Sequence, residues 1–309
     1  MKKTLALALA VVMSLGLLAG CGNSGEKNPG SSGSGSTPNT SASNPGGSSN
    51  PANSIPEAPA GGGTVGVCIY KFDDAFMTTY RNSLEEILEG KGYKVTVVDG
   101  NNDQAKQNEQ INTFITQKVD ALIINPVMTS AADQIISTVK NAGIPTVLIN
   151  REPTREQMAV YDKLVYVGCD AAQSGTFQGE LILDTENKGD INGDGKVSYI
   201  MIQGDPENID AQLRTEYSVK ALTDAGKEVE ELNLTRGDWM RERGQEIVAN
   251  DLAQFGAQVE VVFCNNDDMA IGALQSIQAA GRKVNEDIYL VGVDALDAAL
   301  NEVSNGNMT

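Results

Sequence analysis

The sequence predicts an α/β protein with two doubly wound lobes, each a parallel sheet covered by helices. Apolar runs alternate with amphipathic segments from residue 64 to the end of the chain. These runs are continuous rather than alternating in polarity, which is typical of parallel strands buried on both faces. They number about nine, and such a set suits two sheets better than one very wide sheet.

Strands are expected at residues 65–70, 95–99, 121–125, 146–150, 165–169, 197–202, 259–264 and 288–293, with a weaker one at 229–234. Between them, residues 76–88 place apolar side chains on one helical face, and residues 111–115 form a second stripe behind the helix cap Asp103. A third helix is expected to begin at Ser130, with Asp133 three residues on, and to end at the Gly-Ile-Pro of residues 143–145. The lobes are expected to span residues 64–168 and 169–309.

The first 63 residues are expected to lie outside both lobes. Lys2 and Lys3 precede an apolar run at residues 5–18, so residues 1–20 predict a secretory signal peptide. The Leu-Ala-Gly-Cys that ends at Cys21 resembles a bacterial lipobox, which implies lipidation of Cys21 and anchoring on the extracytoplasmic face of the cell membrane. Residues 21–63, rich in Gly, Ser, Asn and Pro, are expected to form a flexible tether.

Charge and rare residues exclude several functions. Without residues 1–20 the chain has 21 basic and 41 acidic residues, a net charge of −20, and it contains no histidine. Such a charge repels phosphate backbones, so no nucleic-acid partner is expected. Histidine-dependent catalytic triads are excluded. Cys68, Cys169 and Cys264 lie within or at the end of apolar runs, and we expect them to be free thiols with packing roles only.

Residues 190–198 read Asp-Ile-Asn-Gly-Asp-Gly-Lys-Val-Ser, which places oxygen-bearing side chains at positions one, three, five and nine and a glycine at position six. This is the first three-quarters of a calcium loop. Position twelve would be Met201, where an EF-hand has a bidentate Glu, and a strand rather than a helix is expected to follow. Calcium binding therefore needs a remote acid, and the alternative is a polar turn before a strand.

The residues that follow the expected strands are rich in Asp, Asn and Arg. In doubly wound sheets ligands bind beyond the carboxyl ends of the strands. Carboxylates, amides and guanidinium groups can bond neighbouring hydroxyls, as on a sugar. Trp239, the only tryptophan, and Phe76 could cover the apolar faces of a pyranose. The alternatives are helix caps for the single polar residues and ordinary helix-to-sheet packing for Trp239.

Four stretches resemble the galactose/glucose-binding periplasmic proteins: residues 70–77 (Tyr-Lys-Phe-Asp-Asp-Ala-Phe-Met), 102–108, 167–168 and 291–296 (Val-Gly-Val-Asp-Ala-Leu). The resemblance extends from about residue 64 to the end of the chain. It implies a monomer with two lobes that close on a monosaccharide, serving an ABC permease and often a chemoreceptor. The sugar-binding positions that it implies are Asp74, Phe76, Asn125, Asn208, Asp210, Arg214, Trp239, Asn266 and Asp294.

By this resemblance Phe76 and Trp239 stack on the two sugar faces, and the other residues bond the hydroxyls and the ring oxygen. Asn208 departs from the histidine that the family commonly has there, which bears on affinity and on the choice between galactose and glucose. The calcium ligands that the resemblance implies are Asp190, Asn192, Asp194, the Lys196 carbonyl, Ser198 in place of a longer amide, and the remote Glu260. The resemblance also implies two later crossings between the lobes that this sequence does not contain, so the second lobe is expected to be incomplete.

We therefore expect a lipid-anchored solute-binding protein that delivers a galactose- or glucose-like monosaccharide to an ABC importer, and not an enzyme. The alternative is a secreted carbohydrate-active hydrolase that uses two carboxylates among Asp74, Asp210 and Asp294. Arg214 argues against this alternative, because its proximity to Asp210 would lower the pKa of that carboxyl. A sugar-responsive repressor would begin with a basic helix-turn-helix in place of the signal peptide and tether.

Overall fold

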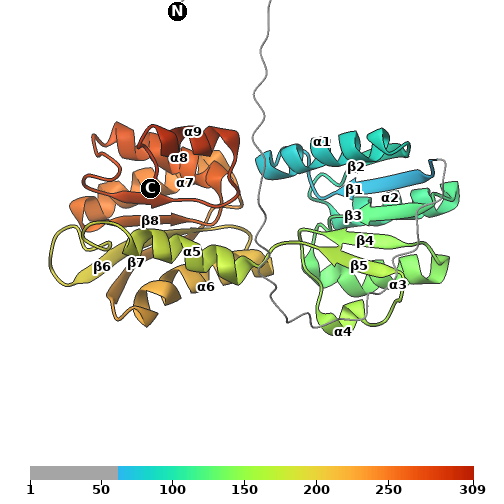
Figure 1. Cartoon of the computed structure of the whole chain (residues 1–309), viewed down its shortest axis with the longest axis horizontal. Helices are drawn as coiled ribbons and strands as arrows, with labels where there is room; N and C mark the ends of the chain where they lie inside the picture. Colours follow the sequence, from blue (N-terminus) through green and yellow to red (C-terminus); the bar gives the residue numbers. More distant parts are fainter. Residues whose placement is uncertain (1–61) are drawn as a thin grey trace, which may run out of the picture. The chain divides into compact units, whose positions relative to one another are not determined.

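The computed structural model describes residues 62–309 (Figure 1), so the predictions for the signal peptide, Cys21 and nearly all of the tether lie outside the described residues. Nine strands form among residues 62–309, as predicted, and they make two parallel sheets. None of the helices in this part of the chain is long and apolar enough to cross a membrane.

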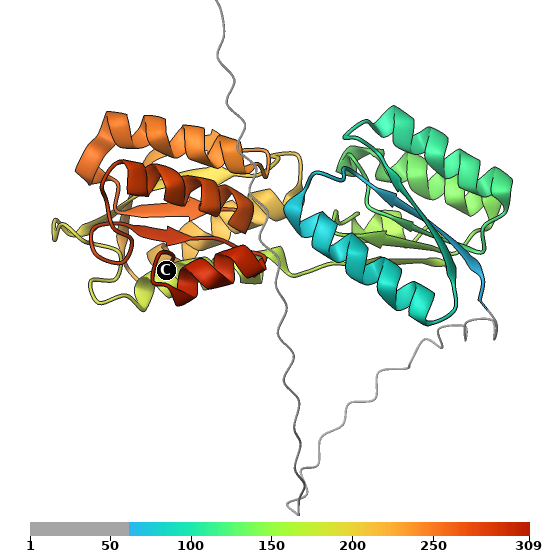
Figure 2. The same cartoon turned by 90° about the horizontal axis from the view of Figure 1, so that it is seen from above.

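The first sheet has five strands in the order β2-β1-β3-β4-β5. Its strands are β1 (Thr64–Ile69), β2 (Lys94–Asp99), β3 (Ala121–Ile124), β4 (Thr146–Ile149) and β5 (Leu164–Val167). Its helices are α1 (Ala75–Gly90), α2 (Gln104–Gln117), α3 (Ala132–Ala142) and the short α4 (Arg155–Met158), with a 3-10 turn η1 (Thr129–Ala131) before α3. Figure 2 shows α1 on one face of this sheet and α2 with α3 on the other.

The second sheet has four strands in the order β7-β6-β8-β9. Its strands are β6 (Lys196–Gln203), β7 (Glu228–Arg236), β8 (Val261–Cys264) and β9 (Tyr289–Val291). Its helices are α5 (Ala171–Leu183), α6 (Ile209–Asp224), α7 (Arg241–Phe255), α8 (Asp267–Ala279) and α9 (Asp297–Ser304), with a 3-10 turn η2 (Gly256–Gln258) after α7.

Each sheet separates two apolar cores, because successive residues of a strand point to opposite faces. In β1, Val67 and Ile69 pack with Met77 of α1, whereas Cys68 packs with Ile111 and Phe114 of α2. In the second sheet one core contains apolar residues of α7 and α8 and the other contains residues of α5 and α6. The predicted burial on both faces is therefore confirmed for the central strands.

The edge strands depart from continuous burial. β2 and β7 consist of exposed and half-buried residues, and Val165 and Val167 of the edge strand β5 are about half exposed (51% and 52%). β9 is also an edge strand but is buried, since Thr309 donates its N–H to the Leu290 carbonyl at 2.9 Å. A continuous apolar run therefore does not by itself establish that an edge strand is buried on both faces.

Two predicted helix starts have different outcomes. Asp103 caps α2 as predicted, because its side chain accepts the N–H groups of Ala105 and Lys106. The predicted start at Ser130 is wrong: Ser130 lies in the 3-10 turn η1, and α3 begins at Ala132 without a side-chain cap. The tighter turn takes up the residues that a capping box would have used.

Candidate functional site

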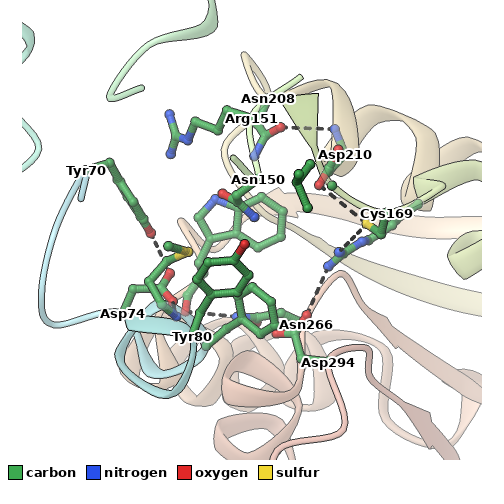
Figure 3. Close-up of a pocket in the computed structure, with 16 residues that line it drawn as sticks. Tyr70, Asp74, Tyr80, Asn150, Arg151, Cys169, Asn208, Asp210, Asn266 and Asp294 are labelled. Atoms are coloured by element: carbon green, nitrogen blue, oxygen red, sulfur yellow. Dashed lines mark hydrogen bonds and ion pairs between the residues drawn. The ribbon is translucent and has the colours of Figure 1, made fainter. Parts of the chain in front are cut away.

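A cavity of about 260 Å³ is lined by residues at the carboxyl ends of strands from both sheets (Figure 3). In each sheet the strand order reverses beside the central strand, and ligands bind at such switch points. Eight of the nine residues predicted to bind sugar line this cavity: Asp74, Phe76, Asn208, Asp210, Arg214, Trp239, Asn266 and Asp294.

Three of these residues also cap helices, so helix capping and a place in the ligand cavity are compatible for these residues. Asp74 accepts the N–H of Met77 at the start of α1 and the hydroxyl of Tyr70. Asn208 accepts the N–H of Asp210 at 3.1 Å at the start of α6, and Asn266 accepts the N–H of Met269 at 3.0 Å at the start of α8. The caps fix these side chains beyond the carboxyl end of each strand, where a ligand can reach their remaining lone pairs.

Arg214 is the cation at the centre of the site. It is 7% exposed, and its Nη1 donates to the Asn265 carbonyl at 2.8 Å and lies 3.4 Å from Oδ1 of Asp294. Burial raises the pKa of Asp294 to about 8, although Arg214 works in the opposite direction. The backbone of Asp294 has a φ of 121°, a region that non-glycine residues rarely enter and that is often found at functional sites.

The expectation that Arg214 lowers the pKa of Asp210 below its ordinary value is wrong. Its pKa is raised rather than lowered, because desolvation by burial exceeds the attraction of Arg214. The side chain is 3% exposed. Sequence proximity identified the charge partner but could not give the depth of burial, which is the larger effect here.

Trp239 is held against the backbone of the strand end. A Cβ atom at Gly204, which directly follows β6, would lie 2.3 Å from the indole ring, so the ring occupies the space that this glycine leaves. Trp239 itself has a φ of 66°, and its carbonyl accepts a hydrogen bond from Asn266 at 3.3 Å. The half-buried Trp239 both packs on the core and lines the cavity, as does Phe76, which packs against Tyr80.

Asn125 is the predicted residue that is not among those lining the cavity. It is fully buried after β3 and ties neighbouring strands together: its Oδ1 accepts the Tyr70 N–H, and its Nδ2 donates to the Ile149 carbonyl. Asn265 plays the same part after β8, accepting the Gly204 N–H at 3.0 Å. Both asparagines brace the carboxyl ends of a sheet.

Several lining residues were not among the predicted ligands, notably Tyr80, Asn150, Arg151 and Cys169. Asn150 and Arg151 directly follow β4, so their place in the polar run after that strand indicated them. The guanidinium of Arg151 stacks 4.4 Å from the Tyr70 ring and lies 3.6 Å from Asp205. The indication for Tyr80 is weaker, because a tyrosine on an apolar helical face equally suits the core.

The packing role predicted for Cys169 is wrong. Cys68 and Cys264 are buried, but Cys169 is exposed and lines the cavity. The reason is that β5 ends at Val167, two residues earlier than the apolar run indicated, so Cys169 belongs to the connection to α5 rather than to the strand.

The loop at residues 190–198 is closed by hydrogen bonds. Its Asp190, Asn192 and Asp194 side chains accept N–H groups within the loop, and the Lys196 N–H is one of these donors. Glu260, only 1% exposed, accepts the N–H of Asn192 at 2.9 Å and of Ser198 at 2.8 Å. Within residues 62–309 no group of three or more Asp, Glu, Cys or His side chains is arranged to hold a metal ion.

The raised pKa of Asp294 predicts a pH-dependent stability. Between the ordinary value of 3.8 and about 8 the folded state keeps a proton that the unfolded state loses. The contribution of this carboxyl to stability is therefore full below pH 3.8 and is lost as pH rises through 8, with a slope of at most about 1.4 kcal/mol per pH unit. Chemical denaturation from pH 4 to 8 measures it. As pH rises from 4 to 8, the free energy of unfolding of the native chain should fall relative to that of Asp294→Asn. A difference between the two that does not change with pH would contradict the assignment.

Two doubly wound sheets whose strand ends contribute to one polar and aromatic cavity define a two-lobe ligand-binding protein. Residues 65–309 match the periplasmic binding protein domain, and the chain belongs to this family.

The relatives are named as binding proteins, and the chain is a binding protein rather than an enzyme. The D-galactose/methyl-galactoside binding periplasmic protein of Haemophilus influenzae is 36% identical over 251 residues, covering 79% of this chain and 74% of the relative. The ribose import binding protein of Bacillus subtilis is 27% identical and covers 80% and 74%. A solute-binding protein of Bacillus halodurans C-125 with bound myo-inositol is 28% identical, with a TM-score of 0.69, and covers 82% and 83%.

Proposed function

We propose that this chain is the solute-binding component of a monosaccharide ABC importer, with a hexose of the galactose or glucose class as its ligand. The observation that carries the proposal is the convergence of eight predicted sugar-binding residues on one cavity. The 36% identity to a galactoside-binding relative favours a hexose. One relative is named for ribose and another has myo-inositol bound, so the test must include a pentose and an inositol as well.

The proposed roles follow from the chemistry of the lining residues. Asp210 and Asp294 present carboxyl oxygens that accept from sugar hydroxyls, and Arg214 donates to a hydroxyl or the ring oxygen. Phe76 and Trp239 cover the apolar C–H faces of the ring. Asn208 uses its carbonyl oxygen to cap α6, which leaves its amide nitrogen free to donate to the ligand.

A ligand held by residues from both sheets gives a mechanism for transport. The sugar gains its full set of contacts only when both sheets present their residues to it, so binding shifts the population toward that conformation. We propose that this ligand-bound conformation is what a permease recognises. A lipid anchor at Cys21 on the extracytoplasmic face and contact with a chemoreceptor are further predictions of the same proposal.

Thermal unfolding with added hexose tests the proposal. At a sugar concentration 100 times the dissociation constant, a ligand that binds only the folded state stabilises it by about 2.7 kcal/mol. For a body of this size we expect a rise in Tm of roughly 5–10 °C. The sugar should be recovered unchanged after prolonged incubation.

Incubation with a glycoside in place of the free hexose tests the hydrolase alternative. Burial in the cavity is the main cause of the raised pKa values of Asp210 and Asp294, so these values need no catalytic role and no turnover is expected. Release of free monosaccharide from a glycoside would establish it. Stabilisation by sugar without any turnover supports the receptor.

We also propose that the loop at residues 190–198 binds calcium with Asp190, Asn192, Asp194, the Lys196 carbonyl, Ser198 and Glu260. These donors are all oxygens, which calcium prefers, and Glu260 already links the loop to β6 through Asn192 and Ser198. A bound calcium ion would supply charge neutralisation for the three carboxylates. The proposed role is structural, since it joins a loop to the strand ends of one sheet.

Calcium should raise Tm in the native chain, and Asp194→Ala should remove that rise because it deletes one of the four loop side-chain ligands. Differential scanning calorimetry with calcium and with a chelator measures both. Asp224→Ala, at an exposed carboxylate paired with Lys220 outside the loop, is the matched control and should keep the rise. A rise that persists in Asp194→Ala, or none in the native chain, would refute the site.

A further inference from the structure

Cys169 is an exposed thiol in the wall of the cavity (Figure 3). It lies in the short connection between β5 and α5. Its Sγ is 3.9 Å from Oδ2 of Asp210 and 3.8 Å from Nη2 of Arg214. The thiol therefore touches two of the side chains to which sugar-binding roles are proposed.

Both of these neighbours are short of hydrogen-bond partners. Asp210 is 3% exposed, and among residues 62–309 the thiol is the partner found for its carboxylate. Arg214 is 7% exposed, and its Nε is buried without a partner in this part of the chain. Buried polar groups in folded proteins are almost always satisfied. This corner of the cavity is therefore where hydroxyl groups of a ligand would complete the hydrogen bonding, and it adjoins the thiol.

The other thiols of the folded body are in a different environment. Cys68 and Cys264 are fully buried, and burial raises the pKa of Cys68 to about 12 and that of Cys264 further still. Because the thiolate is the nucleophile, both thiols are protected from electrophiles: they are inaccessible, and they stay protonated. Exposure alone distinguishes Cys169 as the thiol that a reagent can reach.

We propose that Cys169 is a covalent modification site for soft electrophiles and that its modification closes the cavity to the ligand, an inference that rests on the proposed function. With iodoacetamide as the electrophile, the thiolate sulfur displaces iodide from carbon. One S–C bond forms, one C–I bond breaks, iodide leaves, and the thiol proton goes to solvent. The carbamidomethyl group then occupies the space beside Asp210 and Arg214 that the sugar would take.

The experiment uses the full chain with Cys21→Ser, so that Cys21 does not react. Peptide mass spectrometry should show labelling of Cys169 at least about tenfold faster than that of Cys68 or Cys264. The hexose that binds should slow this labelling. After stoichiometric labelling, titration calorimetry should show at least about a tenfold loss of affinity, the cost expected when a well-fitted polar site loses access to its partners.

Cys169→Ser is the matched variant, because it keeps a small polar group and cannot be alkylated. Whatever its own affinity, its isotherm should be the same before and after treatment. Affinity that survives full labelling of Cys169, or labelling that bound sugar does not slow, would overturn this inference and leave the proposed function intact. An untreated chain that binds no sugar would overturn the proposed function instead, and with it the inference.

Discussion

Replacing Arg214 with methionine is expected to remove measurable sugar binding and to lower the free energy of unfolding by about 3–5 kcal/mol, because it leaves buried carboxyl groups and a buried carbonyl without their cationic partner. Arg214 supports Asp294 at 3.4 Å, attracts Asp210 and bonds the Asn265 carbonyl at 2.8 Å. Methionine keeps most of the volume, so the loss reports charge and hydrogen bonding rather than a cavity. Chemical denaturation and titration calorimetry measure the two effects.

Arg243→Met is the matched control for this change. Arg243 of α7 is half-buried, with 42% of its side chain exposed, and its ion pair with Glu246 at 2.7 Å is on the surface. Such pairs contribute only about 0.2–1 kcal/mol, so both stability and affinity should stay close to those of the native chain. Equal losses in the two variants would show that Arg214 has no special part in the site.

Replacing Gly204 with alanine is expected to weaken sugar binding by at least about tenfold and to cost about 1–3 kcal/mol of stability. The added Cβ would lie 2.3 Å from the Trp239 ring, so the indole must leave its position against the strand end. A stacking surface that moves no longer meets the sugar face. Tryptophan emission should change with the substitution, because Trp239 is the only tryptophan in the chain.

Gly90→Ala controls for the loss of a glycine. Gly90 is the last residue of α1, and a Cβ there would meet nothing within 4 Å. Alanine suits a helix better than glycine, so stability should be equal or slightly higher. A Gly204→Ala protein that binds sugar with native affinity would show that the position of Trp239 does not matter for binding.

The alternation of apolar runs and amphipathic segments was enough to predict the sheets, because few arrangements other than buried parallel strands covered by helices give that pattern. It was weakest where a strand has one neighbour, as at β5. There the apolar run from Val165 continues past the last strand residue, Val167, and Cys169 was assigned to the core for this reason. The polarity of neighbouring residues does not predict where the hydrogen bonding of a strand ends.

The candidate site was predictable to the extent that each residue follows a strand. Asp74, Asn208 and Asn266 come shortly after β1, β6 and β8, and they line the cavity while capping the next helix. Asn125 also follows a strand, but it is turned into the sheet as a brace. The direction of a side chain at a strand end depends on the local backbone, which spacing alone does not give.

Titration calorimetry with a panel of hexoses and pentoses tests the central claim most directly. The proposed function predicts saturable binding of one sugar per chain, with galactose or glucose tighter than ribose and with no heat of continuing reaction after saturation. Absence of binding to every hexose in the panel, or a steady heat of turnover, would contradict it.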